Sequence, residues 1–366
     1  MTSSPEKKPA APEAETASTH QVAVIGAGLT GLSCARSLLG RGFSPTVFDR
    51  GRRPGGRMST RHVEANGSEE ATLSFDLGVP AFEQPVGGFA NEVDRWIRQG
   101  IAGTWIPTEA CWRAGRLEPR TAGGPRIIGQ PTMDAIPRHL AEGLSIRSSM
   151  TVTGLRRTND RWMLSVTPWR EDEREVGPFD SVVLAMAPPQ SVRLLEDTAP
   201  HLKSALERIR MSTIWVALLE MDDPGEELPE ILHLPEHPEL DTLIRESGRT
   251  GRVVGPGRST WVIHARDDWS GERHGTDRTE IAAILEQRTR ALLETITGRS
   301  MRTTRETVAH RWGLARSVTT LEERCLHDDG LRLAICGDGL GGSDIETCHL
   351  GGLAAAECVG RWHPAD

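Results

Sequence analysis

The sequence of 366 residues is longer than one hydrophobic core usually organises, so it favours about two domains or one composite α/β unit and excludes a miniprotein or disulfide scaffold. Its 43 Lys and Arg against 51 Asp and Glu give a net charge of -8, so polyanionic nucleic acid has no overall electrostatic reason to bind. Tyrosine is absent and the only lysines are Lys7, Lys8 and Lys203, which excludes any mechanism that needs a phenol or a further lysine.

Residues 1–19 form a polar segment rich in Ala, Pro, Glu and Thr. This segment lacks the apolar run of a signal peptide or membrane anchor, so we expect a disordered tail. No later stretch approaches the roughly 18 apolar residues of a membrane-spanning helix, and no membrane partner is expected. The six cysteines form no CxxC pair and no Cys/His group with zinc-site spacing, so we expect reduced, mostly buried thiols, no bound metal and a cytoplasmic location.

The ordered chain begins with a βαβ unit that has the fingerprint of a dinucleotide-binding fold. A strand at residues 21–25 leads through a glycine-rich turn into a helical segment, and a second strand follows at residues 45–48. Asp49 ends the second strand and would accept hydrogen bonds from the adenosine ribose. Gly26 would permit the tight turn, and Gly28 would let the backbone approach a pyrophosphate. Gly31 would let the helix pack closely.

A second glycine turn follows in the segment GRRPGGRMSTR at residues 51–61. The Gly55-Gly56 pair would let the chain pass close to a cofactor, and the Arg57 guanidinium would reach the pyrophosphate. An exposed, arginine-rich turn is the alternative. Gly56 and Arg57 are therefore candidate cofactor-binding residues, together with Arg50 beside the ribose-binding aspartate.

The motifs GAGLTGL, VFDR and PGGRMST resemble those of the amine-oxidase-type flavoprotein superfamily. LSFDLGVPAF, at residues 73–82, resembles the Asp-x-Gly stretch that follows in those proteins. The resemblance implies FAD as the cofactor. It also implies that the backbone of Val152 pairs with the adenine, although an ordinary strand valine is the alternative.

The far end of the chain carries a matching half-motif. We expect a buried strand at residues 331–336, a Gly337-Asp338 turn, a glycine-rich loop and a helix from about residue 345 to residue 359. Asp338 would accept a hydrogen bond from a ribityl hydroxyl. The helix N-terminus at Ile345 and Glu346 would direct its positive end at the flavin N1/C2 carbonyl. No cysteine precedes the turn in the monoamine-oxidase pattern, so we expect non-covalent FAD.

Further blocks resemble the renalase-like branch of this superfamily, namely residues 245–252, 259–270, 309–317 and 337–352. The resemblance extends over about residues 20–362. It implies an α/β fold of the p-hydroxybenzoate hydroxylase class, in which a Rossmann-type FAD-binding domain is interrupted by an α+β substrate domain. The FAD-binding domain would comprise residues 20–79, 132–189 and 325–362, and the substrate domain residues 80–131 and 190–324.

Between these motifs, the sequence predicts several elements. Residues 132–140 favour a helix with Thr132 as its N-cap, and residues 277–298 favour a long amphipathic helix. The strands in SIRSSMTVTGLRR, RWMLSVTP and SVVLAMAPP suit a β-meander that returns to the parallel sheet. The acidic segment at residues 221–241 is most simply a surface loop, with a lid as the alternative.

Three residues are candidates for contact with the substrate or the flavin. Trp312 would stack on a planar ring, Arg311 would clamp an anionic group, and His349 lies one turn into the C-terminal helix. The alternatives are packing at the domain interface for Trp312, a surface ion pair for Arg311 and packing under the loop for His349. Trp261 is a second stacking candidate, and His264 would face either the core or the cleft.

These observations leave three hypotheses. The leading one is a renalase-like FAD-dependent oxidase that takes a hydride from a dihydronicotinamide-type or related small nitrogen compound, with reoxidation by O2 to hydrogen peroxide or by another acceptor. The second is a flavin amine oxidase or desaturase of a biosynthetic pathway, which the absence of tyrosine and the helical position of Lys203 disfavour in its standard aromatic-cage form. The third is a catalytically degenerate FAD-binding sensor or partner protein. Monomer and homodimer remain open.

Overall fold

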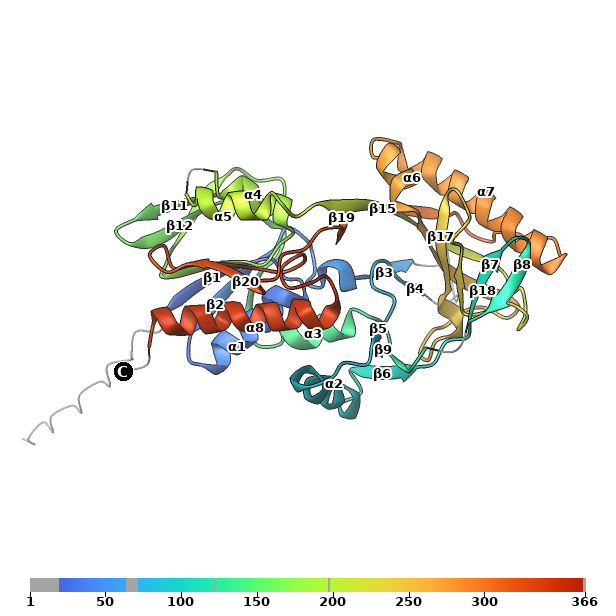
Figure 1. Ribbon diagram of the computed structural model, residues 1–366, viewed down its shortest axis with the longest axis horizontal. Helices are drawn as coiled ribbons and strands as arrows, with labels where there is room; N and C mark the ends of the chain where they lie inside the picture. The colour runs from blue at the N-terminus through green and yellow to red at the C-terminus, as the bar shows by residue number, and fades with distance from the viewer. Residues whose placement is uncertain (1–19, 64–71, 121–122, 197, 365–366) are drawn as a thin grey trace, which may run out of the picture.

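The computed structural model describes residues 20–63, 72–120, 123–196 and 198–364. The tail expected at residues 1–19 lies outside these described residues. Within them, no helix combines the length and the apolar character needed to cross a membrane. Two large sheets lie toward opposite ends of an elongated molecule (Figure 1).

A six-stranded sheet brings together segments from both ends of the chain. In spatial order its strands are β10 (Ser145–Arg147), β2 (Ser44–Phe48), β1 (Gln21–Ile25), β14 (Ser181–Leu184), β21 (Leu333–Cys336) and β20 (Cys325–Asp328). The first five strands are parallel, and β20 is antiparallel to β21. The predicted βαβ unit is therefore confirmed, and the C-terminal strand completes the same sheet.

Both faces of this sheet are covered, because alternate residues of each strand point to opposite sides. Val22 and Val24 pack toward helices, whereas Ala23 and Ile25 pack toward an antiparallel meander. The helices on the first face are α1 (Leu29–Gly40), α3 (Ala135–Ala141) and α8 (Ile345–Trp362) (Figure 1). The second face carries β11 (Met150–Thr158), β12 (Arg161–Pro168), β13 (Arg174–Phe179), α4 (Pro188–Leu194) and α5 (Pro200–Leu206).

A seven-stranded sheet forms the other half of the molecule. In spatial order its strands are β19 (Val308–Ser317), β15 (Met211–Asp222), β18 (Arg258–Ala265), β17 (Leu240–Arg245), β16 (Ile231–His233), β7 (Glu109–Arg113) and β8 (Arg116–Pro119). One face packs through Trp215 and Trp261 against α6 (Asp267–Glu272) and α7 (Arg278–Thr297). The opposite face packs through Val216 and Val262 against Phe75. The predicted amphipathic helix is confirmed, since Ile281 and Leu285 of α7 are fully buried.

Small elements lie between the two large sheets. Phe75 belongs to a two-stranded sheet, and α2 packs beside a three-stranded one. These elements are η1 (Gly56–Met58), β3 (Thr60–Val63), β4 (Leu73–Asp76), β5 (Phe82–Glu83), α2 (Gly88–Arg98), β6 (Ala102–Trp105), β9 (Arg126–Gly129) and η2 (Glu246–Gly248). The long strands β15 and β19 run from the six-stranded half into the seven-stranded half (Figure 1).

Three expected elements differ from the structure. The N-cap of α3 is Asp134 and not Thr132, because the chain before the helix is held by a hydrogen bond of 3.0 Å from the Met133 amide to Asp76. The third meander strand is β13, because the SVVL segment pairs with β1 in the parallel sheet instead. The C-terminal strand begins at Leu333, since Arg332 adopts a φ of 53° in a turn.

The acidic segment at residues 221–241 is not simply a surface loop. It contains β16, which pairs with β7 on one side and with β17 on the other. Ile231 and Leu232 are buried, with exposed fractions of 2% and 0%. This short apolar run is obscured in the sequence by the surrounding carboxylates and prolines, so a strand inside a sheet was missed.

Candidate cofactor and substrate site

The first glycine turn is shaped by close packing at two positions and open at a third. A Cβ at Gly26, whose φ is +114°, would lie 2.3 Å from the Ala185 carbonyl oxygen, and one at Gly31 would lie 1.9 Å from that of Gly26. A Cβ at Gly28 would meet no atom within 4 Å. The chain therefore leaves open space beside Gly28, as the approach of a ligand to the backbone requires.

The N-terminus of α1 and Asp49 border this space. Gly28 is the N-cap of α1, it supplies no side-chain cap, and the first turn contains no acidic residue. The helix therefore presents its positive end without a protein carboxylate in its first turn. Asp49 braces the turn by accepting hydrogen bonds of 2.6 Å from the Ala27 and Gly51 amides. Burial raises the pKa of Asp49, and these two amide hydrogen bonds oppose that shift.

The second glycine turn lies directly against the first. The Gly55 amide donates to the Ala27 carbonyl at 2.8 Å, and Gly28 and Gly55 form an isolated bridge. Gly55 has a φ of +135° and Gly56 a φ of +54°, which are values that side-chain-bearing residues rarely adopt. The two motifs, which are separate in the sequence, thus form one glycine-lined surface.

Arg57 joins this surface to the C-terminal motif. Its guanidinium forms an ion pair with the buried Asp338 carboxylate and donates to the Ala315 carbonyl at 2.8 Å. The second oxygen of Asp338 accepts a hydrogen bond of 2.7 Å from the Ser317 hydroxyl. The structure therefore brings together Arg57, Asp338 and the end of β19, although Arg57 and Asp338 are 281 residues apart.

The remaining predicted cofactor residues lie around these turns. Arg50 is exposed after β2. Val152 is half-buried in β11, which begins at Met150, where the amide donates to the Asp49 carbonyl at 2.8 Å. Gly337 has a φ of +126° ahead of α8, and Ile345 and Glu346 open that helix. Sequence reasoning missed Asp344, the N-cap of α8, whose carboxylate accepts from the Thr347 amide at 2.8 Å.

Trp312 faces the cofactor side of the seven-stranded sheet. Its indole N–H donates to the Leu77 carbonyl at 3.0 Å, in the LSFDLG segment. The next residue, Gly78, is packed so closely that a Cβ there would lie 2.2 Å from the Arg57 carbonyl oxygen. A continuous set of contacts therefore runs from Arg57 through Gly78 and Leu77 to Trp312.

Two histidines lie on the same face of the sheet as Trp312. Strand pairing places His264 of β18 and His310 of β19 on either side of Val216. The Nε2 atoms of both rings are buried and have no hydrogen-bond partner among the described residues. Burial lowers the pKa of each imidazole to about 4, so both rings are neutral near pH 7. The His310 ring stands edge-on to Trp312, with centroids 4.5 Å apart.

Three other candidates lie away from this face. Arg311 points to the opposite side of β19, because neighbouring strand residues alternate; it donates to the His274 carbonyl and lies 5.7 Å from the Trp215 ring. The expected anion clamp beside Trp312 is therefore not formed by Arg311. Trp261 is fully buried on the α7 side.

His349 lies on α8 against side chains of α1 and α2. Its Nδ1 lies 2.9 Å from the Ser33 hydroxyl, and its ring stacks on Phe89 with centroids 4.6 Å apart. Burial lowers its pKa to about 4. It therefore holds α1, α2 and α8 together as a neutral core residue.

A buried ionic cluster lies between the cofactor motifs and the seven-stranded sheet. Arg249 pairs with Asp76 at 3.1 Å and with Glu246 at 2.9 Å, and Arg252 pairs with the same two carboxylates. The Arg249 guanidinium also lies 4.3 Å from the Trp105 ring. Burial raises the pKa of Glu246 to about 7. The sequence singled out this block, 245–252, without indicating that its charges are buried.

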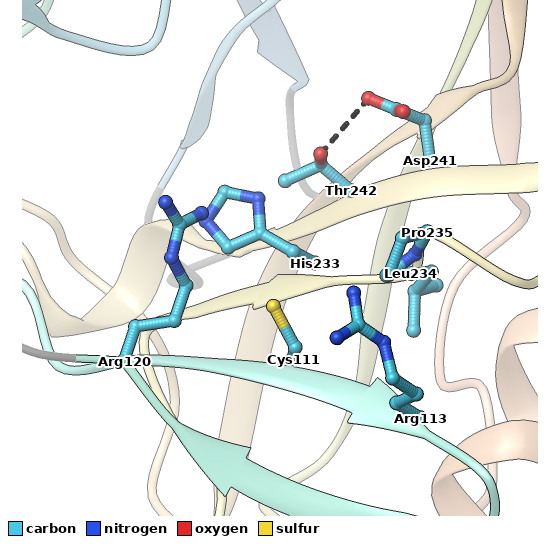
Figure 2. Close-up of a pocket in the computed structure, with 8 residues that line it drawn as sticks. All are labelled: Cys111, Arg113, Arg120, His233, Leu234, Pro235, Asp241 and Thr242. Atoms are coloured by element: carbon cyan, nitrogen blue, oxygen red, sulfur yellow. Dashed lines mark hydrogen bonds between the residues drawn. The ribbon is translucent and has the colours of Figure 1, made fainter.

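A pocket of about 450 Å³ extends the same face of the sheet toward β8. Strand pairing places Cys111, His233 and Thr242 in one row, which continues to His264. Figure 2 shows the guanidinium groups of Arg113 and Arg120 approaching this row from two sides. Sequence reasoning missed this pocket, because its residues come from three strands and two connecting segments.

Two family models together match most of the chain. The model described as NAD(P)-binding Rossmann-like domain matches residues 24–98, and the model described as flavin containing amine oxidoreductase matches residues 90–359. A stretch of 61 residues is 48% identical to Protein FLOWERING LOCUS D of Arabidopsis thaliana. That match covers 17% of this chain and only 7% of the plant protein's length.

Solved structures share the fold across nearly the whole chain. A provisionally assigned protoporphyrinogen oxidase from Exiguobacterium sp. 255-15 is 13% identical, with a TM-score of 0.70 over 93% of this chain and 99% of that one. An oxidoreductase from Methanosarcina mazei is 13% identical, with a TM-score of 0.63 over 92% and 100%. A redesigned putrescine oxidase is 12% identical, with a TM-score of 0.62 over 94% and 100%. These likenesses show the fold alone; together with the two family matches they give a Rossmann-like FAD-binding fold with an additional substrate domain.

Proposed function

The chain belongs to the flavin-containing amine oxidoreductases, and from this premise we propose that it oxidises a small, uncharged nitrogen heterocycle of the dihydronicotinamide type, as renalase-like proteins do. We further propose that O2 is the electron acceptor, with hydrogen peroxide as the co-product, and that FAD is held without a covalent bond. FAD, when bound, supplies two-electron chemistry at a carbon beside nitrogen. The protein supplies position and polarity.

The residues around the glycine turns fit FAD. The open side of Gly28, the uncapped N-terminus of α1 and the Arg57 guanidinium offer backbone space and positive charge for a pyrophosphate. Asp49 and Asp338 place carboxylate oxygens at the ends of β2 and β21, where hydroxyl groups of a ribose and a ribityl chain would donate. Arg57 would thus hold phosphate oxygens and orient Asp338 at the same time.

The observation that carries the substrate proposal is the neutral aromatic face formed by Trp312, His264 and His310. The Trp312 indole can stack on a planar ring. The two neutral imidazoles can donate hydrogen bonds to a carboxamide or accept them from it, and neither ring favours a cation. The only lysine in the described part of the chain is Lys203, which lies on α5 and pairs with Glu207 at 2.9 Å. The tyrosine cage and flavin-proximal lysine of a standard amine oxidase therefore have no counterpart on this face.

The pocket in Figure 2 supports an anionic group on the substrate. Arg113 and Arg120 line this pocket with guanidinium groups, and Arg113 also pairs with Glu236 at 3.3 Å and with Glu118 at 3.8 Å. We propose that they take the role first expected of Arg311. A phosphate or carboxylate bound there would direct the uncharged ring along the row toward His264.

A flavin amine oxidase or desaturase is the second candidate, supported by the family match and by the likeness to a putrescine oxidase fold. The amine would then have to reach the two neutral imidazoles in its uncharged form, since a pKa of about 4 makes both rings weak proton acceptors. The two candidates differ in the charge that the reacting group of the substrate carries in solution.

Anaerobic mixing of the purified yellow protein with each substrate class tests the proposal. We expect the visible flavin absorbance to bleach with 2- or 6-dihydro isomers of NAD(P)H and to remain with primary and secondary amines. Bleaching by amines alone would favour the second candidate. A preparation that stays colourless after incubation with FAD would contradict both.

A further inference from the structure

Five of the six cysteines gather in one part of the six-stranded half of the molecule. Cys34 lies on α1, Cys325 on β20, Cys336 on β21, and both Cys348 and Cys358 on α8. Only Cys111, on β7, lies elsewhere. No step of the proposed flavin chemistry uses any of these thiols.

Within this cluster, Cys325 and Cys358 are distinguished by direct contact. Their Sγ atoms are 4.0 Å apart, and Nη2 of Arg361 donates to the Cys358 sulfur at 3.2 Å. Cys358 therefore lies against a second thiol and accepts a hydrogen bond from a guanidinium, which favours its thiolate. The hydrogen bond from Cys325 is the main cause of a lowered pKa at Cys358, which burial opposes, while the same bond raises the pKa of Cys325.

At the other three clustered thiols, burial is the largest cause of the pKa shift. Burial raises the pKa of Cys34 to about 12 and that of Cys348 to about 11, and it also raises the pKa of Cys336. Thiols of this kind are poor nucleophiles. Cys325 is half-buried on β20, the edge strand of the sheet, whereas Cys336 lies fully inside it on the neighbouring strand.

We propose that Cys358 and Cys325 form a hydroperoxide-reactive dithiol that closes to a disulfide. The Cys358 thiolate attacks one oxygen of hydrogen peroxide, the O–O bond breaks, and the departing hydroxide takes a proton to become water. The Cys325 sulfur then attacks the Cys358 sulfenic acid, the S–O bond breaks, and the hydroxyl leaves with the Cys325 proton as a second water. Two thiols and one peroxide thus give one disulfide and two waters, with the peroxide reduced by two electrons.

The Arg361 guanidinium holds the reacting sulfur as an anion in the first step. An added thiol reductant restores both thiols by exchange. The proposed oxidase reaction would be one source of peroxide. The dithiol does not rest on that function, because added peroxide reacts with it in the same way.

Peptide mapping of the flavin-loaded full chain tests this assignment. After treatment with hydrogen peroxide and alkylation of the remaining thiols, tryptic digestion separates residues 325–332 from residues 333–361. We expect these peptides to be linked through Cys325 and Cys358 and to separate after reduction. The link should persist in Cys336→Ser, Cys348→Ser and Cys111→Ser and be absent in Cys358→Ser and Cys325→Ser.

Arg361→Gln provides a test that keeps every thiol in place. Loss of the guanidinium should raise the pKa of Cys358 from about 6. A rise of about one unit would slow disulfide formation only about twofold at pH 7 and about fivefold at pH 6, so the rate is measured at pH 6. Cys111→Ser, far from the cluster, is the matched control and should react at the wild-type rate. A Cys325–Cys336 link, oxidation of Cys111 alone, or an unchanged rate in Arg361→Gln would each overturn the proposal.

Discussion

Gly28 has a conformation that any residue can adopt, yet its side-chain position is open. Its φ is -77° and its ψ is 178°, so a larger residue would not strain the backbone there. We expect Gly28→Val to fold with the unfolding temperature of the flavin-free wild-type protein but to lose flavin, because the new methyl groups fill the space beside the turn. The absorbance ratio of flavin to protein measures this loss.

The control for this substitution is Gly275→Val, since Gly275 is also open to solvent and lies far from the glycine turns in the sequence. Gly275→Val should retain flavin. Gly26→Val, by contrast, should lower the free energy of unfolding by more than about 2 kcal/mol, because it meets the Ala185 carbonyl in a positive-φ position. Full flavin occupancy in Gly28→Val would show that the site is wrongly assigned.

The buried histidines make stability depend on pH in one direction. Burial lowers the pKa of His264, His310 and His349 to about 4 in the folded state, below the value of about 6.5 in an unfolded chain. The unfolded state therefore binds protons first as pH falls. The contribution of these neutral histidines to the free energy of unfolding is fully present above about pH 6.5. It is lost progressively as the pH falls from about 6.5 to about 4.

Urea unfolding measured at steps between pH 7.5 and pH 4.5 checks this expectation. His349→Gln should flatten the pH dependence by about 1–3 kcal/mol, because it removes one proton-binding group from the unfolded state. His62→Gln serves as the comparison, since His62 lies on the exposed strand β3. An unchanged slope in His349→Gln would show that this ring is not buried neutral.

At the scale of elements, the ionic cluster connects η2 to β4. Arg249, Asp76 and Glu246 have side chains that are 1%, 2% and 0% exposed. Arg249→Met should lower the free energy of unfolding by about 3–5 kcal/mol. The substitution leaves the two buried carboxylates with Arg252 as their shared ion-pair partner. The shift in the midpoint of chemical unfolding measures this cost.

Glu246→Gln should lower the free energy of unfolding by less than Arg249→Met does. Burial raises the pKa of Glu246 to about 7 and so already disfavours its ionised form. Arg258→Met is the matched arginine control, since that side chain is 36% exposed in its pair with Asp222. Equal losses in Arg249→Met and Arg258→Met would contradict the role assigned to burial.

The pocket allows a prediction about substrates. Arg120→Ala should raise KM for a phosphate-bearing dihydronicotinamide by roughly tenfold, the loss of about 1.4 kcal/mol from a charge-assisted contact, and leave kcat unchanged. Arg116→Ala is the matched control, because Arg116 lies on the same strand pair outside the pocket. An equal KM rise with a substrate that lacks an anionic group would contradict an anion-binding role.

Elements with a strong local pattern were predictable from the sequence. The βαβ unit, the Gly-Asp turn and α7 follow directly from glycine spacing and apolar periodicity. The Arg57–Asp338 pair was not predictable, because it joins residues 281 positions apart that lie outside the strands. The row from Cys111 to His310 was not predictable either, because strand register across five pairings decides which side chains share a face. Arg311 illustrates this limit, since its neighbour Trp312 faces the opposite side of the sheet.

For the whole molecule, the candidate cofactor site joins distant parts of the chain. Its residues follow β1 and β21 or lie in η1 and at the end of β19. Because FAD would contact all of them in the folded state only, adding it at about 100 times its Kd should stabilise the protein by about 2.7 kcal/mol. The unfolding temperature of flavin-free and flavin-loaded protein checks this, and an unchanged value would contradict binding at this junction.

The six-stranded sheet also has a consequence for synthesis on the ribosome. β14 pairs on one side with β1, but its other neighbour, β21, begins only at Leu333. Arg57 leaves the ribosome early in synthesis, whereas its ion-pair partner Asp338 leaves only near the end. Nascent chains stopped before residue 333 should therefore bind no flavin, so the cofactor would enter as a late event, after most of the polypeptide has already left the exit tunnel.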